Sequence, residues 1–390
     1  MKAHVLSGID RIDTVAHLLE GKRVGLMTNP TGIDHDFNSS IDVIAGRFQL
    51  TALYAVEHGI RGDIQAGDHV ENCVDEATGV MVYSAYGKNC HFTEEMLDAF
   101  DVLVFDIQDV GARFYTYMYS MAYALEACNR AGKAMIVLDR VNPLGGVKTC
   151  GTIHDRRFAS FVGDYEIPTQ HGLTIGEMAL YVKDFLKLDR VELTVVPLAG
   201  WKRSMRLDET DLPWVAPSPN CATLDAATAY IGTCVFEGTN ISEGRGTTQP
   251  FQVIGAPFLD GPKLAQSANA HQLPGVHFRP TAFCPTFSKH KGELCHGVQV
   301  HVTDADAVNM FEAGLVLLDE IRAQAGEKFE FLYYGIEVEG QQVNSYFLDK
   351  LLGTDDYRLG KKTTAQLIEA HKPGVEAFTK ASKKYHLYDS

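Results

Sequence analysis

Short apolar runs alternate with amphipathic stretches along the first half of the chain. The apolar runs predict strands at 21–28, 50–56, 80–84, 99–105, 134–138 and 191–196. Helices are expected near 38–48, 117–129 and 174–188, the second because Tyr117, Met121, Leu125 and Cys128 recur at helical spacing. Because the strands are almost continuously apolar, the pattern predicts an α/β fold whose mostly parallel, doubly wound sheet carries helices on both faces.

The second half of the chain has a mixed pattern. Three prolines in 212–220 indicate a boundary or a cleft loop. Beyond it the sequence predicts helices at 224–233 and 305–323, a strand at 297–302 and a basic helical tail. We therefore expect two domains, a larger one over 1–212 and a smaller α+β auxiliary domain over 213–390 that contributes to the cleft.

Polar residues follow almost every predicted strand. Ligands bind beyond the carboxyl ends of the strands in open parallel sheets, so these residues are candidates for a site. The candidates are Asn29, Glu57, His58, Arg61, Asp106, Asp109, Arg113, Asp139, Arg140 and Asn142. Further along, His171 precedes a helix, Asn220 ends the proline-rich stretch, and a glycine-rich loop carries Glu237, Asn240, Glu243 and Arg245. Glycines let a backbone approach a ligand closely, so this loop suits a hydroxyl-rich substrate.

Several candidates also have a structural interpretation. Asp106, Asp109 and Arg113 equally suit an ion-pair and capping cluster, and Glu177 closes a Thr174-x-x-Glu177 capping box. Glu57 differs, because a glutamate at the end of a buried strand is expected to have a raised pKa, as a general acid requires. The arginines favour a substrate with a carboxylate, unless neighbouring aspartates neutralise them.

Composition and charge remove several classes of function. The 390 residues are 45% hydrophobic and 22% charged, as in folded globular proteins, and the net charge of −15 disfavours nucleic acid and anionic membranes as partners. The first twenty residues lack the apolar core of a signal peptide, and no uncharged apolar stretch reaches the length of a membrane span. The eight cysteines form no C-x-x-C pair, which predicts that most of them are reduced core residues and that the protein is cytoplasmic.

Familiar cofactor and nucleophile motifs are missing. The sequence has no phosphate-binding P-loop, no dinucleotide fingerprint after the first strand and no G-x-S-x-G elbow. His290, His296 and His301 have no spacing typical of a metal site. We expect neither a cofactor nor a metal.

Five segments in series carry a family resemblance: AVEHGIRGD (55–63), FDIQDVGARFYTYM (105–118), LDRVNPLGG (138–146), HGLTIGEMA (171–179) and FEGTNISEGRGTTQPF (236–251). Together they resemble the exo-β-N-acetylmuramidases of glycoside hydrolase family 171, formerly a bacterial domain of unknown function. The resemblance covers roughly 21–387. It implies a Rossmann-like catalytic domain, an auxiliary domain and release of N-acetylmuramic acid from the non-reducing ends of peptidoglycan fragments such as MurNAc-containing disaccharides and muropeptides.

The residues can be assigned roles on this basis. Glu57 is the expected general acid, and the second catalytic group is Glu243, Glu237 or Glu177, unless the substrate's own acetamido oxygen attacks. We expect Asp106, Asp109, Asp139 and Asn142 to hold sugar hydroxyls, Tyr115 to provide an aromatic platform, and Arg61, Arg113 or Arg245 to bind the lactyl carboxylate.

Two other classes of function and one departure from the family remain. A non-catalytic protein that binds amino sugars would show the same polar residues, whereas a transferase would need a phosphate cradle that the sequence lacks. Family members are often secreted, so the missing signal peptide predicts a role on imported fragments unless a leader was removed. Retention or inversion depends on the separation of two carboxylates, which the sequence does not give.

Overall fold

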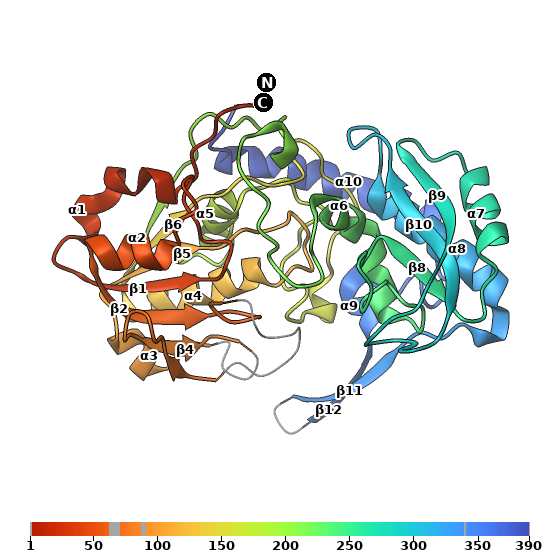
Figure 1. Ribbon diagram of the computed structural model, residues 1–390, viewed down its shortest axis with the longest axis horizontal. Coiled ribbons are helices and arrows are strands. Elements are labelled where there is room, and N and C mark those ends of the chain that lie inside the picture. Colours follow the sequence, from red (N-terminus) through yellow and green to blue (C-terminus); the bar gives the residue numbers. More distant parts are fainter. Residues whose placement is uncertain (1, 62–70, 87–90, 339–340, 390) are drawn as a thin grey trace.

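A seven-stranded sheet forms the centre of the first half (Figure 1). The structure, a computed structural model, describes residues 2–61, 71–86, 91–338 and 341–389. The strands of this sheet are β1 (Arg23–Thr28), β2 (Gln49–Ala55), β3 (Cys73–Val74), β4 (Met81–Ser84), β5 (Val102–Asp106), β6 (Ala134–Leu138) and β7 (Glu192–Val196). Their order is β3-β4-β2-β1-β5-β6-β7, and every neighbouring pair is parallel except β3 with β4. The mostly parallel sheet predicted from the apolar runs is confirmed, while the two-residue β3 was too short to predict.

Helices cover both faces of this sheet. The 3₁₀ helix η1 (Ile9–Val15), α1 (Ala16–Leu19) and α2 (Ser40–Arg47) share an apolar core with Leu26 of β1. The next residue, Met27, belongs to the other core, with α3 (Glu94–Asp98), α4 (Tyr117–Ala131) and α5 (Ile175–Phe185). Successive side chains of a strand point to opposite faces, so a continuously apolar strand fills both layers. This is why the sequence pattern predicted the long strands together with α2, α4 and α5, whereas it did not predict η1, α1 or α3.

The second half carries smaller antiparallel sheets. β8 (Val253–Ala256), β9 (Val276–Phe283) and β10 (Cys295–Val302) form a sheet of order β8-β10-β9, and β11 (Tyr333–Val338) pairs with β12 (Gln341–Tyr346). The helices are α6 (Leu224–Thr233), α7 (Gly261–Ala270), α8 (Met310–Ala325), α9 (Phe347–Leu352) and α10 (Thr364–Ser382). The predicted α6 is confirmed, but α8 starts later than predicted because the Asn309 side chain accepts from Glu312 N (3.3 Å) and caps it. The described residues include no helix with the length and apolarity to cross a membrane.

The two halves share packing. α6 and α8 cross so closely that a Cβ on Gly232 would lie 1.9 Å from Met310 O, and a single apolar cluster runs from α4 to both helices. The C-terminal residues then return to the first half, where Leu387 N donates to Glu177 Oε1 (2.9 Å). Ala3 and Tyr388 pack against the same apolar cluster, so the two ends of the described chain lie close together (Figure 1). The division at residue 212 stays a prediction.

Candidate active site

A cavity of about 250 Å³ lies between the carboxyl end of β2 and the second half of the chain. It is lined by Glu57, His58, Tyr86, Phe114, Tyr115, Thr116, Tyr117, Phe161, Val162, Ser218, Cys221, Tyr230, Glu237, Arg245, Phe251 and Phe347. Aromatic rings therefore dominate the wall, and two carboxylates and one guanidinium interrupt it. A mostly apolar concave surface with a few placed polar groups is typical of a small-molecule site.

Glu57 is held at this wall by two hydroxyl groups. Its Oε1 lies 2.8 Å from the Tyr86 hydroxyl, and its Oε2 lies 2.7 Å from Thr116 Oγ1. The following residue, His58, has a φ of 75°, so the chain turns sharply after Glu57. Hydroxyl groups both donate and accept, so these contacts orient the carboxyl group in either protonation state. The half-buried Glu57 thus lines the cavity.

Glu237 lines the same cavity from the second half of the chain. It lies in the 3₁₀ helix η5 (Cys234–Gly238), and its Oε1 accepts from Arg245 Nε (3.0 Å) and Nη2. The Arg245 guanidinium lies 5.2 Å from the centre of the Phe251 ring. Burial lowers the pKa of Arg245, but its ion pairs with Glu237 and Glu243 outweigh burial and raise that pKa overall. Arg245 therefore stays charged beside the cavity.

Glu243 does not line this cavity. Its buried carboxylate pairs with Arg245 Nε (3.3 Å) and with Lys289 Nζ (2.7 Å). Lys289 also donates to three backbone carbonyls of the glycine-rich loop, those of Phe236, Thr239 and Ile241. The Glu243 position thus supports the loop that presents Glu237 and Arg245.

Tyr115 brings a hydroxyl group to the cavity wall. Its ring packs edge-on against Tyr117 (5.0 Å) and Tyr230 (5.9 Å). Burial, with smaller effects of Tyr117 and Cys221, raises the pKa of Tyr115 well above its usual value. By geometry its hydroxyl makes no full hydrogen bond within the described part of the chain, although the Ser218 and Tyr117 side chains lie close enough to affect the pKa values of Tyr115 and Tyr117. A buried hydroxyl without a full hydrogen bond is costly, which makes this group a candidate for contact with a ligand.

Asp106, the last residue of β5, forms an ion pair with Arg140 away from the cavity. Arg140 donates to Asp106 from Nε (2.6 Å) and Nη2 (2.8 Å), and Ser40 Oγ donates to the same carboxylate (2.5 Å). Both side chains are buried. The geometry therefore favours the ion pair over the predicted role of Asp106 in holding sugar hydroxyls and over Arg140 as a substrate-binding candidate.

Asp139 is likewise used inside the fold. It accepts from Thr174 Oγ1 (2.8 Å), Gly176 N (2.7 Å), Arg140 N (2.9 Å) and the Tyr388 hydroxyl. Its side chain is fully buried, and burial raises its pKa to about 7 against the effect of these hydrogen bonds. Asp139 thus joins β6 to the start of α5 and to the C-terminal tail. It is not one of the residues that line the cavity.

Glu177 has the capping role that its motif indicates. Thr174 and Glu177 form the complete capping box of α5, and Glu177 also pairs with Arg203 Nη1 (2.5 Å). Both charged groups are buried, and Glu177 lies outside the cavity lining. We therefore leave Glu177 out of the proposed catalytic groups.

The other two arginines predicted to bind the lactyl group lie outside the cavity lining. Arg113 is fully buried and donates to backbone carbonyls, among them Ile167 O (3.1 Å) and Leu351 O (2.6 Å). Burial lowers its pKa to about 10. Arg61 pairs with Asp75 (2.6 Å) and is exposed. Arg113 therefore holds the two halves together, and neither contact favours substrate binding.

The predicted amide and histidine residues have mixed positions. Asn142 bonds to Leu144 N and Leu173 O (both 3.0 Å), and Asn240 bonds to Glu330 N (3.0 Å) and Lys328 O (2.8 Å), so both hold loops. Three more of these residues, and with them the predicted Asp109, are buried without lining the cavity: Asn29, His171 and Asn220. Asn29 Nδ2 and Asp109 Oδ1 have no hydrogen-bond partner among the described residues, whereas His171 Nε2 lies 3.6 Å from Asp109 Oδ2. His58 lines the cavity itself.

Two family models match the chain. Their descriptions are exo-β-N-acetylmuramidase NamZ, N-terminal, over residues 24–225, and exo-β-N-acetylmuramidase NamZ, C-terminal, over residues 228–388. The peptidoglycan β-N-acetylmuramidase NamZ of Bacillus subtilis strain 168 is 47% identical over 394 residues, covering 99% of this chain and 92% of that protein. The chain belongs to the NamZ family. The family resemblance read from the five sequence segments is confirmed.

Solved structures of two relatives have the same fold. Both are DUF1343 family proteins of Bacteroides fragilis NCTC 9343, with TM-scores of 0.88 and 0.77 and sequence identities of 35% and 29%. Each match covers 99% of both chains. The chain therefore shares its overall fold with these two relatives.

Several residues of the cavity wall were not predicted from the sequence. Tyr86 and Thr116 hold Glu57, and Phe161, Tyr230 and Phe347 contribute rings. No motif marks these residues, because an aromatic residue in an apolar stretch is predicted to belong to the hydrophobic core. Thr116 alone had a signal, since it lies inside the segment FDIQDVGARFYTYM that carries the resemblance.

Proposed function

We propose that this protein is an exo-β-N-acetylmuramidase that releases N-acetylmuramic acid from the non-reducing ends of peptidoglycan fragments, and that the cavity at Glu57 is its active site. One observation carries the assignment of the site: Glu57 and Glu237, from opposite halves of the chain, line the same cavity. Membership of the family supports the reaction. The order of the parallel strands, β4-β2-β1-β5-β6-β7, supports describing the first half as Rossmann-like.

Glu57 is the proposed general acid. Hydrolysis of a glycoside needs a carboxylic acid that protonates the leaving oxygen and a second group on the opposite side of the sugar. The Tyr86 and Thr116 hydroxyls contact both oxygens of Glu57. They can hydrogen-bond to the carboxylic acid before it gives up its proton and to the carboxylate afterwards. Glu237 is the proposed second group, acting as a nucleophile, as a base for water or as a group that orients the substrate's acetamido oxygen.

Arg245 and Tyr115 are the proposed binding groups. N-acetylmuramic acid carries a lactyl carboxylate, and Arg245 is the one cavity-lining arginine among the described residues. Its Nε and Nη2 bind Glu237, while its Nη1 has no acceptor within the part of the chain that the structure describes. We assign Nη1 to the lactyl group and the Tyr115 hydroxyl to a sugar oxygen. The cytoplasmic location and the action on muropeptides stay predictions.

The experiment is hydrolysis of a chromogenic β-N-acetylmuramide by the wild type and by Glu57→Gln. Glutamine keeps the size of the side chain and its hydroxyl contacts but has no proton of suitable acidity. We expect kcat to fall at least about a hundredfold, the scale of a lost general acid. Glu94→Gln, an exposed glutamate of α3, is the matched control and should retain wild-type activity.

A chromogenic β-N-acetylglucosaminide tests the specificity. The wild type should cleave the muramide and leave this substrate, which lacks the lactyl group, intact. Retained activity in Glu57→Gln would remove Glu57 from the mechanism. A wild type that binds N-acetylmuramic acid and cleaves neither substrate would favour the sugar-binding protein instead.

A further inference from the structure

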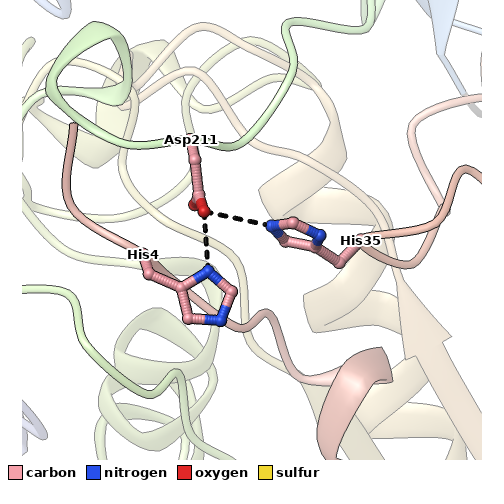
Figure 2. Close-up of side chains that lie close together, drawn as sticks. All are labelled: His4, His35 and Asp211. Carbon is pink, nitrogen blue, oxygen red and sulfur yellow. Dashed lines mark hydrogen bonds and ion pairs between the residues drawn. The ribbon is translucent and has the colours of Figure 1, made fainter. Parts of the chain in front are cut away.

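Two histidines and an aspartate from three distant segments meet at the surface (Figure 2). His4 lies in the N-terminal segment, His35 in the loop after β1, and Asp211 after the 3₁₀ helix η4 (Leu207–Glu209). His4 Nδ1 lies 2.6 Å and His35 Nε2 lies 3.2 Å from the same atom, Asp211 Oδ2. The three ligand atoms lie within 4.8 Å of one another, and all three side chains reach solvent.

The backbone holds these side chains in place. Ala3 N donates to Glu209 O (2.8 Å) and Asp211 N donates to Ala3 O (2.9 Å), which sets His4 beside Asp211. His35 N donates to Asp10 Oδ1 (2.6 Å). Groups on fixed backbone segments lose little freedom when they bind a common ligand.

A further contact orients the carboxylate. Val5 N donates to Asp211 Oδ1 (3.0 Å), the oxygen that does not contact the histidines. Hydrogen bonds of this kind are what position the ligands in metal sites, because they fix the lone pairs that face the ion. With Oδ1 held by Val5, the other oxygen of Asp211, Oδ2, faces both imidazole rings.

We propose that His4, His35 and Asp211 form a binding site for a divalent first-row transition ion, of which zinc is the best match. Two imidazoles and one carboxylate suit zinc, whereas calcium and magnesium prefer oxygen ligands alone. Ligand atoms at about 2.0–2.1 Å on a tetrahedral ion lie about 3.3 Å apart. The 3.2 Å contact already has this spacing, and the shorter 2.6 Å contact involves the exposed His4 side chain, which solvent leaves room to move.

The ion would replace both histidine–carboxylate hydrogen bonds and would take water in its remaining position. It would tie the N-terminal segment to the loop after β1. None of the three residues lines the cavity at Glu57, so the site is independent of the proposed hydrolysis.

The test is a zinc titration of tag-free, full-length protein against a chromogenic zinc indicator. We expect one equivalent of zinc to bind, with affinity weakened at least tenfold by His4→Ala and by Asp211→Asn. His17→Ala removes an exposed histidine of α1 and should change nothing. Zinc at a hundredfold excess over its dissociation constant should raise the thermal midpoint of the wild type by roughly 3 °C and that of the variants less.

Three outcomes would overturn the proposal. The first is no saturable zinc binding below about 100 µM. The second is wild-type affinity in folded His4→Ala and Asp211→Asn, which would place the ion elsewhere. The third is equal competition by magnesium or calcium. Circular dichroism and muramide hydrolysis identify any variant that fails to fold, since His4 and Asp211 lie outside the cavity at Glu57.

Discussion

Four carboxylate side chains of this protein lie in two kinds of surroundings. Glu57 and Glu237 line the cavity, whereas Asp106 and Glu177 are buried inside the fold. Glu57 is half-buried and contacts two hydroxyls beside open volume. Glu177 is fully buried and is occupied by Arg203 and by its capping box. Asp106 is occupied by Arg140 and Ser40.

The difference shows that a polar residue that follows a strand can stabilise the neighbouring loops as readily as it can bind a ligand. The strand ends of a parallel sheet expose several loops whose backbone and charges must be satisfied, and most candidates meet that need. The cavity at Glu57 lies where the second half of the chain faces the sheet, and Glu57 and Glu237 line it. The following predictions test this division between structural and functional groups.

The largest effect is expected for Glu177→Ala. Removing one partner of a buried pair leaves Arg203 charged and uncompensated, which costs about 3–5 kcal/mol of the free energy of unfolding. Urea denaturation measures it. Glu177→Gln, which keeps the capping geometry without the charge, should cost less. The exposed pair of Glu369 with Lys372 is the control, since Glu369→Ala should change stability by under about 0.5 kcal/mol.

Kinetics of the same variant sharpen the comparison. Folded Glu177→Ala should hydrolyse the muramide within about threefold of the wild type, in contrast to the hundredfold loss in Glu57→Gln. Wild-type stability together with a hundredfold loss of kcat in Glu177→Ala would return Glu177 to the catalytic groups.

An intermediate effect is expected from the titration of Asp139. Its pKa in the folded protein, about 7, lies above the usual value of 3.8, so folding favours the protonated form. The stabilisation is complete below the unfolded pKa and is lost as pH rises toward 7. At 1.36 kcal/mol per pKa unit, about 2 kcal/mol should disappear between pH 5 and pH 7.

The measurement is urea denaturation across this range for the wild type and for Asp139→Asn, which cannot titrate. The wild type should lose stability relative to the variant as pH rises. Parallel pH profiles for the two proteins would show that Asp139 is ionised throughout and that its four hydrogen bonds outweigh burial.

The smallest effect is expected for Tyr115→Phe. Loss of one hydrogen bond to the substrate costs about 0.5–1.5 kcal/mol, so kcat/KM should fall about three- to tenfold. Stability should stay the same or rise, because the Tyr115 hydroxyl makes no full hydrogen bond among the described residues.

Tyr119→Phe is the matched control for this change. Its buried hydroxyl donates to Arg113 O (2.7 Å) and lies outside the cavity lining, so its removal should lower stability by about 1 kcal/mol and leave kinetics unchanged. A variant Tyr115→Phe with wild-type kinetics and lower stability would place Tyr115 among the structural groups.

The sequence predicted the main sheet well and the site unevenly. Strands such as β6 (Ala134–Leu138) are nearly continuous apolar runs, and burial on both faces requires that pattern. The capping motif at Thr174 likewise gave the start of α5. Short or half-exposed elements such as β3 and β9 carry no such pattern and were missed.

The candidate site shows where local patterns stop being informative. The sequence set Glu57 apart through its place at the end of a buried strand, but it did not separate Glu237 and Arg245 from Asp106 or Arg113. Arg113 finds its carbonyl partners in residues 152, 167 and 351, and His4 meets Asp211 across more than half the chain.

The sequence by itself determined the family, the α/β class and the loops that carry polar groups, because these follow from periodicity and from motifs of adjacent residues. The tertiary structure decided which of those groups are consumed by ion pairs and which face a cavity. That decision depends on partners far away in the chain, since burial and hydrogen bonding are set by everything that packs around a side chain.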